Sequence, residues 1–112
     1  AGPLEDRMKL DRKLVDVILP MFFQTVPETI EGLRAAIREG NQKTSRRLAH
    51  SLKGASAQMG ATGMCNIAAR LEEFAVQGNL AEIENLLPEF NATSEKTFSL
   101  MSQWRESIGK EL

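Results

Sequence analysis

The only histidine of the chain lies in the stretch AHSLKGASAQMG, residues 49–60. Lys53 follows His50 by three residues and Gly54 follows it by four, so the three share one face if the stretch is helical. A glycine inside a helix costs about 1 kcal/mol relative to alanine, and it usually serves a close approach or a ligand. An exposed imidazole beside a position without a side chain is suited to holding a phosphoryl group that a partner brings close.

The surroundings of His50 are basic and small. Three cations lie within the seven residues before it, namely Lys43, Arg46 and Arg47. Together with Lys53 they could offset the negative charge of a phosphoryl group. Ala57 lies one turn beyond Gly54 and extends the bare patch. The ordinary alternative for a lone helical histidine is a solvated surface residue on a purely structural bundle, and the residues alone leave that alternative open.

Other chemistries find little support in the sequence. One histidine and one cysteine, Cys65, do not make a zinc or iron cluster, so no metal site is predicted. The cysteine has no histidine near it in the sequence, which disfavours a Cys–His nucleophile. Neither a GxxxxGK[ST] loop nor a GxGxxG fingerprint occurs, so the sequence offers no means of binding ATP.

The composition is that of one globular domain. The 112 residues are 42% hydrophobic and 26% charged, with a net charge of −1, which gives no general attraction to nucleic acid or anionic lipid. A lone cysteine suits a reducing compartment, and no apolar run approaches the roughly 20 residues of a membrane span. Residues 1–9, which begin Ala1-Gly2-Pro3, are interpreted as a linker or a remnant of expression, and residues 10–109 as the folded domain.

The pattern of apolar residues predicts an all-α domain. No segment alternates apolar and polar residues over the length of a strand. Four amphipathic helices with short links favour an antiparallel, up-down-up-down four-helix bundle. The predicted connections are Gly40-Asn41, Gly60 to Gly63, and Gly78-Asn79.

The apolar stripes also predict the core. Pro20 and Pro27 should give a short or kinked leading helix before the stripe resumes, and Pro88 should bend the last helix or mark its first turn. His50 lies about 200° around its helix from Leu48, outside the stripe. The predicted inward residues are Leu14, Val17, Ile18, Met21 and Phe22; Ile30, Leu33 and Ile37; Leu48, Leu52, Ala55 and Met59; Met64, Ile67, Ala68, Leu71, Phe74 and Ala75; and Ile83, Leu87, Phe90, Ser94, Thr97, Met101, Trp104 and Ile108.

AHSLKGASAQMGA, residues 49–61, resembles the signature of histidine phosphotransfer (HPt) domains. That signature is a histidine, a lysine three residues later, a glycine four residues later and a second glycine ten residues later. His50, Lys53, Gly54 and Gly60 match all four positions. The likeness extends from about Leu10 to Ile108 and includes a proline in the first helical region and an Arg-Leu-Glu in the third helix, here Arg70, Leu71 and Glu72.

The resemblance implies a phosphorelay intermediate without kinase activity of its own. His50 would accept a phosphoryl group from a receiver-domain aspartate and pass it to another. Lys53 would steady the phosphate, and Glu72 would hold Nδ1–H of the imidazole. Receivers would dock over Lys43, Arg46, Arg47, Gly54, Ala57 and Gly60.

The resemblance further implies that the chain needs no cofactor, because the receiver brings Mg²⁺. Response-regulator receiver domains would be the partners, without nucleic acid or membrane insertion, and the isolated domain would be a monomer. It would be cytoplasmic, either free-standing or at the cytoplasmic end of a membrane-bound hybrid sensor kinase. A helical adaptor that docks receivers without being phosphorylated is the competing hypothesis.

Overall fold

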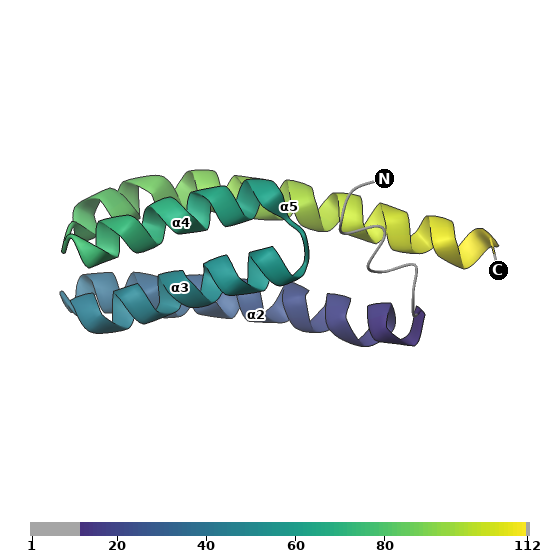
Figure 1. Cartoon of the computed structure of the whole chain (residues 1–112), viewed down its shortest axis with the longest axis horizontal. Helices are drawn as coiled ribbons and strands as arrows, with labels where there is room; N and C mark the ends of the chain where they lie inside the picture. The colour runs from purple at the N-terminus through teal and green to yellow at the C-terminus, as the bar shows by residue number, and fades with distance from the viewer. Residues whose placement is uncertain (1–11, 112) are drawn as a thin grey trace.

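The computed structural model describes residues 12–111 of the chain and the side chains of residues 15–107. Within that range it contains four α-helices and no strand, as the sequence predicts (Figure 1). The helices are α2 (Arg12–Arg38), α3 (Gln42–Gln58), α4 (Thr62–Val76) and α5 (Leu80–Glu111). None of them combines the length and the hydropathy that crossing a membrane would require. Residues 1–9, the predicted linker, lie outside the described residues.

The helices form an antiparallel bundle in which each helix packs mainly against two neighbours. The links between them span only a few residues, so consecutive helices run in opposite directions (Figure 1). The substantial contacts are α2 with α3, α3 with α4, α4 with α5, and α2 with α5. Around the bundle the helices therefore follow the order α2, α3, α4, α5. The groove between α3 and α4 lies on the opposite side of the bundle from the groove between α2 and α5.

The three links share one backbone design. Each contains a glycine in the left-handed region, where a side chain would be strained: Gly40 at φ 67°, Gly60 at φ 69° and Gly78 at φ 74°. The residue after each glycine donates its N–H to the carbonyl five residues back, at 2.8, 2.9 and 2.8 Å respectively. These bonds satisfy carbonyls that the helix end leaves without partners. The predicted connections are confirmed, except that Gly63 lies within the first turn of α4.

α2 is one helix that runs through both Pro20 and Pro27. The prolines do not separate a short leading helix from the rest, because the helix can lose single backbone hydrogen bonds where its apolar face is well packed. That face also differs from the predicted one, since Val17 and Met21 are exposed. The residues of α2 that are buried in the core are Val15, Leu19, Phe22, Val26, Ile30, Leu33 and Ala36.

α3 buries a face of small residues. Its buried members are Ser45, Ala49, Leu52, Ser56 and, at the C-cap, Met59, whereas the predicted Leu48 and Ala55 are only partly buried. The hydroxyl of Ser45 donates to the carbonyl of Asn41 at 2.8 Å, and that of Ser56 to Leu52 at 2.7 Å. The serines are therefore buried without an unsatisfied hydroxyl.

α2 approaches α3 closely at Gly32. A Cβ atom added at Gly32 would lie 3.3 Å from Cδ1 of Leu48. The bare backbone on α2 thus leaves room for the partly buried leucine on α3.

The predicted core of α4 and α5 is largely confirmed. Met64, Ile67, Ala68, Leu71 and Ala75 of α4 are buried, and Phe74 is partly buried. In α5 the buried members of the predicted series are Ile83, Leu87, Phe90, Ser94 and Met101. Thr97 and Trp104 are partly buried, and the side chain of Ile108 lies outside the described residues. Pro88 lies inside α5, not in its first turn.

Candidate functional site

His50 lies in the middle of α3 on the face turned away from the core. Its side chain is 68% exposed, whereas Ala49 and Leu52 on either side of it are buried. The helix therefore presents the imidazole to solvent while its own small residues pack inward.

Glu72, on the facing helix α4, holds the inner side of the imidazole. Its Oε2 lies 2.5 Å from Nδ1 of His50, and its Oε1 accepts a hydrogen bond from Nζ of Lys53 at 2.6 Å. One carboxylate thus joins the two α3 residues that stand three positions apart. The prediction that Glu72 lies across from His50 required a gap-free register through the turn at Gly60 to Gly63, and the contact between the two side chains shows that register.

The charge state of Glu72 determines the tautomer of His50. The hydrogen bond from Lys53 lowers the pKa of the Glu72 carboxyl, the hydrogen bond from His50 lowers it further, and burial opposes both. The side chain is only 18% exposed, and it is an ionised acceptor at neutral pH. An ionised carboxylate can only accept, so Nδ1 of the ring must donate. In the neutral ring Nε2 then carries the free lone pair.

A shallow depression at the surface contains most of the predicted basic residues. It is lined by Lys43, Arg46, Arg47, His50 and Glu72. Cationic groups therefore surround the imidazole on the N-terminal side of α3. No side-chain ion pair at 4.0 Å or less is formed by these three cations within the described part of the chain.

The remaining predicted site residues lie toward the C-terminal end of α3, outside the depression. Gly54 is exposed, and a Cβ atom added there would meet nothing within 4 Å. Ala57 is also exposed, and Gly60 lies in the turn that joins α3 to α4. The surface beside His50 thus has a basic half and a half without long side chains.

Among the described residues, no group of three or more histidine, cysteine, aspartate or glutamate side chains could hold a metal ion. Cys65 is a partly buried free thiol on α4.

The sequence prediction placed Lys53 close to a phosphoryl group on His50 but missed its hydrogen bond to Glu72. The signal was available, because the register that brings Glu72 to His50 also brings it within reach of a lysine one turn further along α3.

The chain matches known proteins by family and by structure. The Hpt domain family matches residues 17–108. Histidine-containing phosphotransfer protein B (HptB) from Pseudomonas aeruginosa PAO1 has a similar crystal structure, with a TM-score of 0.85 and 28% sequence identity over 93% of this chain and 90% of that one. A search of curated proteins returned no match. The chain therefore belongs to the Hpt domain family, whose members act as phosphotransfer intermediates that exchange phosphoryl groups with the receiver domains of response regulators.

Proposed function

We propose that His50 is the residue of this Hpt domain that carries the phosphoryl group. The observation that supports this assignment is the contact of Nδ1 with Glu72 on a ring that is otherwise 68% exposed. A nucleophile needs an accessible lone pair and a fixed tautomer, and this arrangement provides both at Nε2. His50 is also the only histidine of the sequence.

The proposed transfer is a displacement at phosphorus. The Nε2 lone pair of His50 forms a bond to the phosphorus of a receiver aspartyl phosphate, and the bond from phosphorus to the aspartate oxygen breaks. The aspartate leaves as a carboxylate. The ring becomes a phosphoimidazolium that keeps its proton on Nδ1, where Glu72 balances the positive charge. The reverse displacement passes the phosphoryl group to a second receiver aspartate.

Lys53 is proposed to support the phosphorylated state. Its Nζ is bound to Glu72, yet its side chain is 37% exposed. It lies one turn from His50 on the same face, so a rotation of its flexible chain can bring the ammonium group toward a phosphoryl group on Nε2. Glu72 then keeps its bond to the imidazole. Lys53 thus serves the carboxylate before transfer and the phosphate after it.

The proposed receiver-docking surface covers both halves of the surface beside His50. Lys43, Arg46 and Arg47 offer positive charge to the acidic residues around a receiver's phosphorylated aspartate. Gly54 and Ala57 leave space for the receiver backbone to approach, and Gly60 closes the surface at the turn. Such charge complementarity mainly speeds encounter, while close contact slows dissociation.

We also propose that the chain works without a cofactor of its own and without kinase activity. The receiver would bring Mg²⁺ and most of the transfer machinery. The isolated domain would be a cytoplasmic monomer that does not bind nucleic acid. The competing adaptor hypothesis requires docking of receivers without phosphorylation of His50.

The two hypotheses separate in one experiment. The chain is incubated with a phosphorylated receiver and Mg²⁺, and the bound phosphate is tested for stability in acid and alkali. Acid-labile, alkali-stable label is expected on the wild-type chain and none on His50→Gln, whose helical circular dichroism should be unchanged. Label that survives the substitution contradicts the assignment of His50, and receiver binding without any label supports the adaptor.

A further inference from the structure

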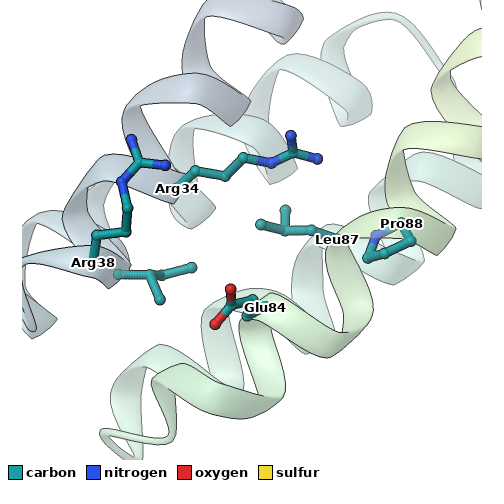
Figure 2. A pocket seen from close by; sticks show the side chains of 6 residues that line it. Arg34, Arg38, Glu84, Leu87 and Pro88 are labelled. Atoms are coloured by element: carbon teal, nitrogen blue, oxygen red, sulfur yellow. The ribbon is translucent and has the colours of Figure 1, made fainter.

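A second pocket lies between α2 and α5, in the groove on the opposite side of the bundle from His50. It has a volume of about 310 Å³ and is lined by Arg34, Ile37, Arg38, Glu84, Leu87 and Pro88 (Figure 2). Leu87 is buried and Ile37 is partly buried against the core. The pocket therefore has an apolar floor and polar walls.

One wall of the pocket carries two guanidinium groups. Arg34 and Arg38 both line the pocket from α2, where Arg34 extends toward Leu87 and Arg38 runs along its own helix, and Glu84 lies on the facing helix α5 (Figure 2). Among the residues that the structure describes, Arg34 forms one ion pair, with Glu31 on its own helix at 3.6 Å, and the two side chains are 40% and 70% exposed. Such a pair is weak and can be exchanged for a better partner. Arginine forks bind carboxylates bidentately, so this wall is suited to acidic groups.

The opposite wall offers acceptors for hydrogen-bond donors. Pro88 has no N–H, so it cannot make the usual helical bond to the carbonyl of Glu84 four residues earlier. The same turn of α5 thus carries a carboxylate and a main-chain carbonyl without its usual helical partner. A ligand that presents both carboxylates and N–H groups beside an apolar side chain would satisfy all three parts of the pocket. These are the groups of a polypeptide.

The shape of the pocket favours a protein segment over a small molecule. The pocket is partly open to solvent, whereas small-molecule sites enclose most of the ligand surface. Arg34 and Arg38 stand about 6 Å apart along the helix axis, which matches carboxylates one helical turn apart. Arginine and large apolar residues are also the types that supply much of the binding energy at protein interfaces.

We propose that this pocket is a second docking site, which binds an acidic segment of a partner protein that carries an apolar side chain beside its carboxylates. The carboxylates pair with Arg34 and Arg38, and the apolar side chain packs on Ile37 and Leu87. Because the α2–α5 groove lies across the bundle from the α3–α4 groove, the segment can remain bound while His50 engages a receiver. The site would tether the domain to a partner without interrupting transfer.

The test uses the isotope-labelled full chain and a defined probe, an acetylated and amidated peptide of glutamate and leucine with the glutamates one helical turn apart. Saturable chemical-shift changes are expected in the last turns of α2 and the first turns of α5. The double variant Arg34→Gln/Arg38→Gln should bind the peptide about tenfold more weakly or worse and should accept phosphate at the wild-type rate. A peptide with lysine in place of glutamate should not bind.

The matched control is Arg46→Gln/Arg47→Gln, which removes the same charge from α3. It should bind the peptide like the wild-type chain but react more slowly with a phosphorylated receiver. The proposal is overturned if no saturable shifts occur, if Arg34→Gln/Arg38→Gln binds the peptide unchanged, or if the lysine peptide binds equally well. Shifts centred on residues 43–50 would also overturn it, since they would place the acidic peptide on the receiver-docking surface. The peptide-binding readouts, which alone decide the proposal, do not require His50 to be phosphorylated.

Discussion

Gly54 offers a substitution that should improve stability and impair function. It lies inside α3 with ordinary helical backbone, and a Cβ atom there would meet nothing within 4 Å. Alanine therefore adds no clash and removes the helix penalty of glycine, a gain of up to about 1 kcal/mol in the free energy of unfolding. In a domain of this size that gain corresponds to a rise in Tm of about 4 °C. Thermal unfolding followed by circular dichroism measures it.

A longer side chain at Gly54 should separate stability from transfer. Gly54→Gln should raise or preserve the Tm, because glutamine is also a good helix former. Its side chain would cover the surface that a receiver must approach, and a loss of about 1.4 kcal/mol in that contact slows transfer about tenfold. The assay is the rate of phosphoryl transfer from a phosphorylated receiver under limiting concentrations. Transfer at the wild-type rate would refute the role of the bare patch.

Gly32 serves as the control for the stability argument. There the added Cβ would lie 3.3 Å from Cδ1 of Leu48, so Gly32→Ala should gain less than Gly54→Ala or lose stability. A lower Tm for Gly54→Ala, or an equal gain at both positions, would contradict the account of open space at α3.

Three further predictions concern the residues around His50. Because the pKa of Glu72 is lowered in the folded state, its ionised form stabilises the fold above the ordinary pKa of 4.5, and this contribution is lost as the pH falls through the lower, folded-state value. Urea unfolding should therefore show that Glu72→Gln is less stable than the wild-type chain at neutral pH. The difference in stability should close in acid. Lys53→Ala should slow transfer or shorten the lifetime of the phosphohistidine while costing no more than about 1 kcal/mol in stability, and an unchanged rate and lifetime would reduce Lys53 to a partner of Glu72. Added salt should lower the association rate of a receiver more than it raises the dissociation rate, and Arg46→Glu/Arg47→Glu should reproduce that effect at low salt. Equal association rates for the variant and the wild-type chain would show that these arginines are not part of the docking surface.

The sequence predicted the parts of the fold that depend on local signals. Gly40, Gly60 and Gly78 end their helices because each occupies backbone that other residues adopt only with strain, and a glycine at such a position is visible in the sequence. The short links then require antiparallel neighbours. The bundle and the exposure of His50 follow from these turns together with the spacing of apolar residues.

The buried faces of α2 and α3 could not be predicted in the same way. α2 has apolar residues around much of its circumference, so Val17 and Met21 fit a stripe as well as Val15 and Leu19 do. α3 buries Ser45 in place of a larger apolar side chain, and the hydroxyl is satisfied by a carbonyl of the preceding turn. Only the packing against neighbouring helices decides between such faces.

The candidate site was predictable in outline for the same reason. The four signature positions lie close together in the sequence, and Glu72 follows from the register of the turn. The bond between Lys53 and Glu72 depends on side-chain conformations that the sequence does not specify. The pocket at Arg34 and Arg38 arises from two helices at opposite ends of the described chain, which no local pattern brings together.

The ring of helix contacts also has a consequence for the order of folding. Three of the four contacts join helices adjacent in the chain, and only α2 with α5 must bring its distant segments together, as in the pairing of Phe22 with Phe98 at 5.4 Å between ring centroids. Closing that long loop carries the largest entropic cost, whereas the α3–α4 hairpin closes a short one. His50 and Glu72 lie within the hairpin, 22 positions apart. The geometry that fixes the imidazole can therefore form before the bundle closes, and a transient opening between α2 and α5 need not dismantle it.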